Sequence, residues 1–275
     1  MASVADIRTY VYGATYDSWN RVQTMTYPDG EVVTYHYNAA GQVERLTSNK
    51  QGRQSVIVDR IGYDKEGHTV YTKLGNGTET TYIYDKQRER LQAMNLTADG
   101  QTVMENRYRY DAVDNILGIT NAANPTSLTK LNKAKLGGGS SHAYEYDELN
   151  RLIHANGKAK RASYDMVIWI QTPRPNTTPN TNPGPPVSWN DPSNPDDPQA
   201  GYGYIPNDTT KEETFFYHSD HLGSTSYITD DHANITQYDA YLPYGELLVD
   251  EHSSSEDLPY KFNGKQFDEE TGLYY

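Results

Sequence analysis

The sequence contains no cysteine among its 275 residues, which excludes disulfide bonds and thiol chemistry. Long hydrophobic runs are missing too, since the longest, residues 166–170, has five residues and a membrane-spanning helix needs about 20. The first residues lack the apolar stretch that forms the centre of a Sec signal peptide. We therefore predict no membrane span and no Sec signal peptide within this sequence.

An excess of positive charge is also missing. Lys and Arg number 24 against 37 Asp and Glu, and the formal net charge is −13. Because phosphate binding needs a basic surface, we expect no nucleic-acid partner. The local group of Lys130, Lys133 and Lys135 is more typical of a solvated loop than of a binding patch.

Phe is rare among the aromatic residues, with only 4 Phe against 25 Tyr. Hydrophobic residues make up 35% of the chain and the mean hydropathy is −0.86, so any core must be small and built largely from tyrosine. A tyrosine-rich, charged composition suits an extended β-sheet surface better than a compact enzyme.

Tyrosine followed by Asp or Asn recurs at regular intervals. The pairs begin at residues 16, 37, 63, 84, 110 and 146, so consecutive spacings are 21, 26, 21, 26 and 36. A fixed period indicates one supersecondary unit used repeatedly. The predicted repeat residues are Tyr16, Asp17, Tyr37, Asn38, Tyr63, Asp64, Tyr84, Asp85, Tyr110, Asp111, Tyr146 and Asp147.

Each part of the pair has a structural reason. A Tyr ring packs on a pleated sheet, while an Asp or Asn side chain accepts hydrogen bonds from backbone N–H groups just ahead of it in a turn. Between the pairs, Val33, Tyr35 and Tyr37 fall on one face of a strand by alternation. We therefore predict a curved, all-β antiparallel sheet of hairpin repeats, and we interpret the pairs as turn elements rather than catalytic dyads.

Hairpin signals support these strands. Asp29-Gly30, Asn76-Gly77 and Asp99-Gly100 lie between alternating runs. Such dipeptides are favoured in two-residue hairpins, where both central residues need positive φ. They reinforce the prediction of repeated antiparallel pairs.

Composition divides the chain into three predicted parts. Residues 1–165 carry the repeats, with an inserted loop over 121–141. Residues 166–208 hold most of the prolines, which remove backbone donors, so we predict a linker. Residues 209–275 contain all four Phe and form a separate β-rich C-terminal segment.

The motifs together resemble the Rhs family of YD-repeat proteins, which is related to the teneurins. The repeat carries YDSWNRV at 16–22 and YDELNRL at 146–152, and the C-terminal segment carries HSDHLGS, YLPYGE and TGLYY. Family-like residues in that segment are His218, Asp220, His221, Leu222, Gly223, Pro243, Gly245, Glu246, Gly272 and Leu273.

The resemblance implies a non-enzymatic section of a spiral β-sheet shell that encloses a C-terminal toxin cargo in a longer bacterial protein, secreted or at the cell surface. Two departures stand out. The proline-rich segment replaces further repeats, and the sequence stops at Tyr275, before the family's self-cleavage motif and toxin. We therefore expect a section of a longer protein or a remnant, and no autoproteolytic residue is carried over.

Other interpretations stay open at this point. Exposed Tyr rings of the repeat can stack on carbohydrate or on a cell-surface partner, and open sheet edges favour self-association. His218 and His221, with His232 and the Asp230-Asp231 pair nearby, can form a zinc hydrolase site only if a third ligand joins them. The acidic run Asp268-Glu269-Glu270 lies near a chain end, where the burial needed for acid–base catalysis is not expected. We predict no catalytic residue, no metal and no cofactor.

Overall fold

A computed structural model describes residues 10–160, 162–167, 214–253, 258–268 and 273–274. The chain divides into two compact units, one formed by Met1–Ile168 with Glu213–Tyr275 and one by Trp169–Glu212. The second unit lies outside the described residues, and so does most of the predicted linker. All further description concerns the first unit.

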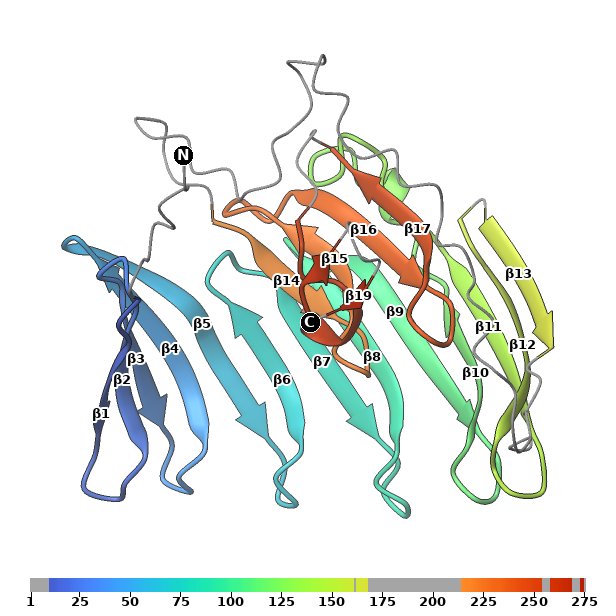
Figure 1. Ribbon diagram of the computed structural model, residues 1–275, viewed down its shortest axis with the longest axis horizontal. Coiled ribbons are helices and arrows are strands. Elements are labelled where there is room, and N and C mark those ends of the chain that lie inside the picture. Colours follow the sequence, from blue (N-terminus) through green and yellow to red (C-terminus); the bar gives the residue numbers. More distant parts are fainter. Residues whose placement is uncertain (1–9, 161, 168–213, 254–257, 269–272, 275) are drawn as a thin grey trace, which may run out of the picture. The chain divides into compact units, whose positions relative to one another are not determined.

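The first unit is dominated by one antiparallel sheet of 13 strands that neighbour one another in sequence order (Figure 1). The strands are β1 (Gly13–Tyr16), β2 (Val22–Thr26), β3 (Val32–Tyr37), β4 (Val43–Lys50), β5 (Arg53–Tyr63), β6 (Thr69–Leu74), β7 (Glu79–Tyr84), β8 (Leu91–Ala98), β9 (Gln101–Tyr110), β10 (Ile116–Asn121), β11 (Ser140–Tyr146), β12 (Leu152–Ala159) and β13 (Ala162–Val167). This arrangement confirms the all-β, repeated-hairpin prediction.

Strand register gives the sheet two different faces. Tyr35 pairs with Leu46, Tyr82 pairs with Met94, and Tyr108 pairs with Ile119, and directly paired residues share a face. Following the register across the sheet defines a tyrosine face that carries Tyr35, Leu46, Val58, Ile61, Tyr82, Met94, Leu96, Met104, Tyr108, Ile119, His142, Tyr144 and Tyr164. The opposite face carries mainly Thr and charged residues, such as Thr34, Thr47, Glu79, Arg107 and Lys158.

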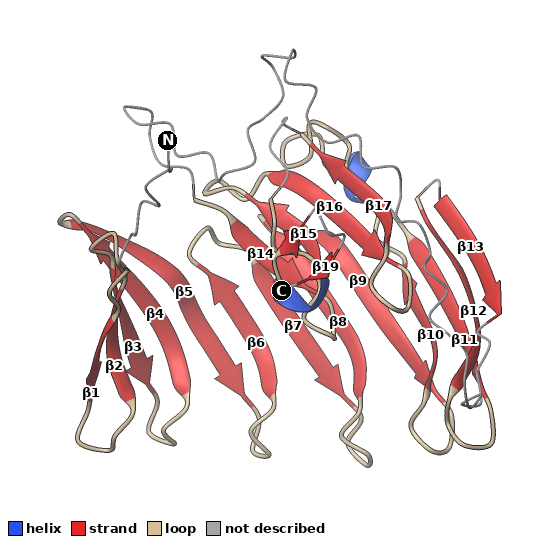
Figure 2. Ribbon diagram, viewed as in Figure 1, coloured by secondary structure: helices blue, strands red, loops and turns tan. Residues whose placement is uncertain are grey.

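A second sheet of four antiparallel strands is formed by the C-terminal segment (Figure 2). Its strands are β14 (Phe216–Ser219), β15 (Thr225–Thr229), β16 (Ile235–Tyr241) and β17 (Leu247–His252), and a short pair, β18 (Phe267–Asp268) and β19 (Leu273–Tyr274), follows. The helical elements among the described residues are two 3-10 turns, η1 (Pro125–Ser127) and η2 (Phe262–Gly264). No helix in the described part of the chain is long and apolar enough to cross a membrane.

The main hydrophobic core lies where the four-stranded sheet packs on the tyrosine face. Its cluster combines residues of β8 and β9 with residues of β15 and β16 and with leucines of the loop between β10 and β11. Members include Met94, Leu96, Met104, Tyr108, Leu128, Leu131, Leu136, Tyr227, Ile235 and Tyr238. We call this contact region the seam.

The inserted loop contributes more to the hydrophobic core than its composition indicated. Lys130, Lys133 and Lys135 are exposed, as expected of a solvated loop. Leu131 and Leu136, however, are 7% and 5% exposed and belong to the core. The backbone N–H of Ile235 also donates to the Leu131 carbonyl at 2.6 Å, so this loop joins the two sheets.

The hairpin dipeptides behave in two ways. Asp99 and Gly100 both have positive φ, 48° and 69°, as the sequence predicted. In the other two pairs only the glycine does, Gly30 with φ 85° and Gly77 with φ 85°. Those turns are longer, and there the Asp or Asn side chain accepts a backbone N–H two residues ahead.

Candidate functional site: the YD turns and the seam

Six YD turns, at residues 16–21, 37–42, 63–68, 84–90, 110–115 and 146–151, connect alternate strand pairs along one edge of the large sheet (lower edge in Figure 1). In each turn the Asp or Asn side chain accepts backbone N–H groups within the turn. Asp147 Oδ1, for example, accepts the N–H groups of Leu149 and Arg151, each at 2.9 Å. The carboxylate therefore accepts these N–H groups in place of a backbone carbonyl, as the sequence predicted.

Two residues end each turn. The first has a left-handed backbone and the second directly precedes the next strand; we call them the left-handed residue and the closing residue. The left-handed residues are Asn20, Gly41, Gly67, Glu89, Asp114 and Asn150. The closing residues are Arg21, Gln42, His68, Arg90, Asn115 and Arg151.

The closing side chain usually binds the second oxygen of its own Asp. Arg21 Nη2 lies 2.6 Å from Asp17 Oδ2, and Arg151 Nη2 lies 2.7 Å from Asp147 Oδ2. Hydrogen bonds from the Arg21 and Trp19 backbone and from the Arg21 guanidinium hold the pKa of Asp17 below its usual value. The bond from the Arg151 side chain lowers the pKa of Asp147 in the same way.

In five of the six turns the Tyr hydroxyl donates a hydrogen bond to the preceding hairpin. Tyr37 donates its hydroxyl to the Val22 carbonyl at 2.7 Å, and Tyr110 donates to the Leu91 carbonyl at 2.7 Å. The same bond is made by Tyr63, Tyr84 and Tyr146, to Val43, Thr69 and Ile116. Tyr241 repeats it in the small sheet, to the Thr225 carbonyl at 2.9 Å. The repeated Tyr therefore joins one hairpin to the previous one.

Replacing Tyr110 by Phe is expected to lower the free energy of unfolding by about 1 kcal/mol, because the Leu91 carbonyl loses its phenol donor while the ring still packs. Urea denaturation measures this change. Tyr16→Phe is the matched control, since Tyr16 is 58% exposed and its hydroxyl has no partner in the described part of the chain. Equal losses in both variants would contradict the assigned role of the phenol.

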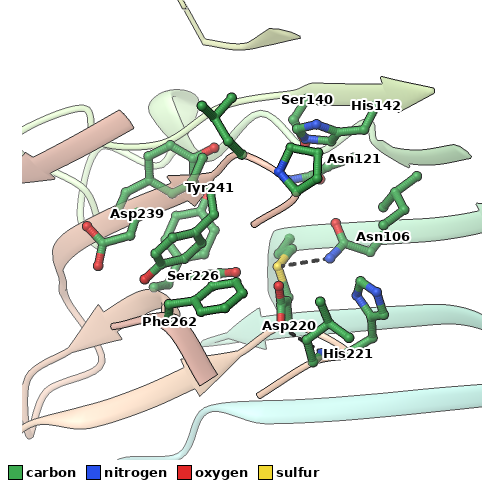
Figure 3. A pocket seen from close by; sticks show the side chains of 18 residues that line it. Asn106, Asn121, Ser140, His142, Asp220, His221, Ser226, Asp239, Tyr241 and Phe262 are labelled. Atoms are coloured by element: carbon green, nitrogen blue, oxygen red, sulfur yellow. Dashed lines mark hydrogen bonds between the residues drawn. The ribbon is translucent and has the colours of Figure 1, made fainter. Parts of the chain in front are cut away.

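The seam contains a small, partly open cavity of about 100 Å³ between the two sheets (Figure 3). Asn106 and His142 line it from the large sheet, and Asp220, His221 and Tyr241 line it from the small one. The His221 ring packs edge-on against Tyr108 with 5.0 Å between ring centroids. The turn that carries Asp220 and His221 is thus held against β9.

Burial shifts the titration of these groups. It lowers the pKa of His142 to about 4 and that of His218 to about 3, and it also lowers the pKa of His221. Burial raises the pKa of the Asp220 carboxyl. The imidazoles of the seam are therefore neutral near pH 7.

Polar contacts tie the two sheets together at the ends of the seam. Asn76 Nδ2 donates to Thr229 Oγ1 and to the Asp230 carbonyl, each at 2.8 Å. At the other end, Lys160 Nζ lies 2.6 Å from Glu251 Oε2. The seam is consequently a specific junction, and its cavity is small for a substrate.

The two histidines of the metal hypothesis have separate structural partners. His218 is 4% exposed, and its Nε2 lies 2.8 Å from Thr229 Oγ1. His221 belongs to the turn after β14 and contacts Tyr108. Within the described ranges, the group of side chains close enough to hold a metal ion is instead Asp230, Asp231 and His232, on the neighbouring turn.

Several other family-like residues of the C-terminal segment lie in turns. Asp220 Oδ1 accepts the N–H groups of Leu222 and Ser224, and Gly223 has φ 84°. Gly245 has φ 103°, and a Cβ there would lie 2.7 Å from the Phe262 ring. These contacts require glycine at that turn.

The remaining members of that set are placed as follows. Pro243 lines the seam cavity, and the Glu246 carbonyl accepts the N–H of Leu242 at 2.8 Å. Leu273 belongs to β19, while Gly272 and the run Glu269-Glu270 lie outside the described residues. The structural role assigned to the set as a whole stays a proposal.

Sequence reasoning did not identify the left-handed and closing residues as a set. Their signal was present, because Gly, Asn or Asp precedes the closing residue in five of the six turns. Asn106, 8% exposed at the cavity, gave no such signal, since a single Asn within a strand has no distinguishing spacing.

The geometry defines a class: a YD-repeat β-sheet protein whose repeat is built on turn-forming Asp and hairpin-joining Tyr. A family model described as RHS Repeat matches residues 16–54. Toxin subunit YenC2 of Yersinia entomophaga is 33% identical over 129 residues, which are 44% of this chain and 13% of that protein. The tRNA nuclease WapA of Bacillus subtilis (strain 168) is 24% identical over 266 residues, 94% of this chain and 10% of WapA.

Solved structures show the same fold. The TcdB2-TccC3-Cdc42 crystal structure superposes with a TM-score of 0.76 at 16% identity, covering 99% of this chain and 20% of that one. The Photorhabdus luminescens Tc holotoxin pore gives a TM-score of 0.65 at 14% identity, covering 97% of this chain and 19% of that one. The chain thus spans a fifth or less of the proteins it matches. The comparisons support the resemblance to the Rhs family of YD-repeat proteins.

Proposed function

We propose that this chain is a non-enzymatic section of the β-sheet wall of an Rhs-type toxin-delivery protein, and that the wall encloses a C-terminal toxin cargo in a longer polypeptide. The cargo lies against the tyrosine face. The protein acts outside the cell that makes it, secreted or at the surface of a bacterium. Its relatives include toxin subunits and a nuclease, which supports a role in toxin delivery.

The observation that carries the proposal is the uneven covering of the tyrosine face. Over β8 to β11 the four-stranded sheet and the loop leucines cover it, and the core lies there. In strands β1 to β7 only Val33 and Ser48 are buried, although Tyr35, Leu46 and Ile61 continue the same face. A sheet normally buries its apolar face against another layer, so a cargo layer explains this composition.

The polar groups of the structure support a non-enzymatic role. The carboxylates of the repeated Asp residues accept hydrogen bonds from backbone N–H groups of their own turns. Of the seam histidines, His218 is buried and His142 and His221 are half-buried; all three have lowered pKa values, and they contact Thr229, Tyr164 and Tyr108 respectively. These contacts give each group a structural partner, which supports a role in holding the sheet together.

Limited proteolysis tests the proposal. In the full polypeptide that carries this chain, purified from the producing cell, we expect the segment C-terminal to the wall to resist protease until the wall is unfolded by urea. Mass spectrometry of the fragments identifies which segment survives. Cleavage of that segment at the same rate in the folded protein and in urea would refute enclosure.

Carbohydrate binding is the second candidate, and one observation favours it. Exposed aromatic rings lie on both sides of β1 in the sequence: Trp19, in the turn after it, is 80% exposed, and Tyr10 and Tyr12, before it, are 66% and 65% exposed. The Arg21 guanidinium lies 5.8 Å from the Trp19 ring. A glycan array with wild type and Trp19→Ala decides this candidate: glycan signals lost in the variant support it, and an array without hits removes it.

A further inference from the structure

A polar groove lies over β3, β4 and β5 on the face of the large sheet opposite the tyrosine face (strands labelled in Figure 1). Its volume is about 390 Å³, within the range of about 300–1,000 Å³ that is usual for ligand pockets. We call it the outer groove. Register places its side chains in rows across the strands, which are His36 with Arg45, Thr34 with Thr47, and Asn49 with Gln54.

A bulge in β5 shapes this groove. The register of β4 with β5 moves from Val58 to Val56 within one step, so Ile57 is an extra residue in β5. Such a bulge bends its strand and increases the local twist. The next hairpin holds the bend in place, because the Gly75 N–H donates to the Ile57 carbonyl at 3.0 Å. A Cβ on Gly75 would lie 1.7 Å from the Val56 carbonyl oxygen, so this close approach requires glycine.

The charge of the groove is opposite in sign to that of the chain. The chain carries 37 Asp and Glu against 24 Lys and Arg, yet none of the described residues that line the groove is acidic. The neighbouring Glu44 is exposed and does not line it. In the described part of the chain the Arg45 guanidinium has no hydrogen-bond or ion-pair partner. Its planar set of N–H groups is therefore available to donate two parallel hydrogen bonds to one carboxylate or phosphate.

The rest of the lining suits the hydroxyl groups of a ligand. Thr34 and Gln54 carry a hydroxyl and an amide, which both donate and accept hydrogen bonds. Asn49 Oδ1 accepts the Gly52 N–H at 3.1 Å, so its Nδ2 group is left to donate. Val56 is the one apolar residue of the lining, so an apolar ligand would bury little apolar surface there.

Two alternatives fit the structure less well. A peptide cannot add to these strands as a further strand, because β3 pairs with β2 and β4, and β5 pairs with β4 and β6. A second hollow, between the turns at 63–68 and 84–90, is lined by the carboxylates of Asp64, Glu66, Asp85 and Glu89, which repel an anion. Of these two hollows, the outer groove has the chemistry that suits an anion.

We propose that the outer groove binds a hydroxylated anion, a sugar acid or a sugar phosphate, with the anionic group on the Arg45 guanidinium and hydroxyl groups on Thr34 and Gln54. Both ligand classes present the same chemistry, which is an anion beside hydroxyl groups. The groove lies on the face opposite the tyrosine face, so this ligand and a cargo do not compete. Binding needs neither a cargo nor a closed wall, and it stands apart from the proposed function.

Titration of the intact, isotope-labelled chain, followed by the nuclear magnetic resonance shifts of its amides, tests the groove. The probes are glucuronate, a glucose phosphate, glucose, inorganic phosphate and a short peptide of glutamates. For the two sugar anions, with about 13 to 16 non-hydrogen atoms, we expect a Kd of about 1 mM and shifts confined to β3, β4 and β5. Glucose should bind about 10-fold more weakly or less, because it lacks the anionic group.

Arg45→Gln should weaken binding of both sugar anions about 10-fold or more, because their hydrogen bonds to a charged group are lost. Arg45→Lys should recover part of the affinity, since it restores the charge but not the planar set of donors. Arg60→Gln is the matched control, because Arg60 is exposed on β5 and does not line the groove. Its affinity should stay within about 2-fold of wild type. Thr34→Val should weaken the sugar anions about 3- to 10-fold through one lost hydrogen bond.

A preference between glucuronate and the glucose phosphate supports the site and identifies its anion. No shift with either sugar anion, or equal losses in Arg45→Gln and Arg60→Gln, overturns it. Inorganic phosphate that binds as tightly as the glucose phosphate, or wild-type affinity in Thr34→Val, overturns the hydroxyl contacts. Tighter binding of the glutamate peptide overturns the assignment to sugars. Each of these results leaves the protease test of an enclosed cargo unchanged, so the two proposals can fail separately.

Discussion

Acidification from pH 6.5 to pH 4 is expected to lower the free energy of unfolding by about 3 kcal/mol through His142 alone. Burial lowers the pKa of this imidazole to about 4, whereas its unfolded value is 6.5, and one pKa unit corresponds to about 1.4 kcal/mol. For a base whose folded pKa is lowered, the unfolded state binds more protons below pH 6.5. Stability is therefore complete above that pH and is lost as the pH falls toward the folded pKa.

His218 acts with the same sign and at a deeper position. It is 4% exposed, its pKa is lowered to about 3, and its Nε2 lies 2.8 Å from Thr229 Oγ1. Asp220 acts with the opposite sign, because a carboxyl with a raised pKa loses stability as the pH rises through that value. The two histidines outnumber it, so we expect a net loss in acid.

Urea denaturation at pH 7, 5.5 and 4 measures this effect. His142→Gln and His218→Gln should each flatten the pH dependence, because an amide does not titrate in this range. His232→Gln is the control, since 72% of the His232 side chain is exposed. A pH profile that is unchanged in both buried-site variants would show that these imidazoles do not control acid stability.

Below about pH 3.8 a second loss is expected from the YD turns. The pKa values of Asp17 and Asp147 are lowered by the bonds they accept in their turns, so their contribution is present above the unfolded value and disappears as the pH falls through the folded one. The two windows overlap near pH 3 to 4, because the histidine losses continue down to the folded pKa values of about 4 for His142 and about 3 for His218.

Replacing Leu96 by Ala is expected to lower the free energy of unfolding by about 2–5 kcal/mol, the range for a buried large-to-small change that leaves a cavity. Leu96 is 1% exposed and belongs to the core cluster beneath the four-stranded sheet. Its register partner Met104 is 2% exposed, so the surroundings are well packed on the same face. The surrounding side chains therefore have little room to move into the cavity that Ala would leave, so the loss should not be reduced by such a movement.

Ile83→Ala is the matched control for Leu96→Ala. Ile83 lies on the neighbouring strand β7, pairs with Ala93 on the opposite face, and is 50% exposed. Its truncation should change stability by less than about 0.5 kcal/mol. Equal losses from both variants, measured by thermal and urea denaturation, would mean that the core does not lie at the seam.

The repeat itself was predictable from local chemistry. Tyr followed by Asp, at a fixed period, specified both the turn and the strand end, and alternation placed Val33, Tyr35 and Tyr37 on one face as the register confirms. Asp-Gly dipeptides were a weaker guide. Asp99-Gly100 forms the two-residue turn, but the Asp29-Gly30 turn is longer, since the preceding Tyr27 accepts Gly30 N–H and closes a larger loop.

The seam was not predictable in the same way. Asn106 and His142 are ordinary strand residues by sequence, and Leu131 lies in a loop with lysines around it. Only the packing of the C-terminal segment, from residue 214 onward, on the tyrosine face places all three at the seam. Division of the chain at 165 and 208 stays a prediction, because most of that linker lies outside the described residues.

What the sequence determined by itself was everything governed by contacts within a hairpin: the turns, the strand order and the two faces, because these depend on side chains a few residues apart. The tertiary structure alone decided which part of the tyrosine face is covered, which residues of successive turns are in contact, and which histidines are shielded from solvent. Those outcomes depend on contacts between residues that are distant in the sequence, and a local sequence pattern does not predict such contacts.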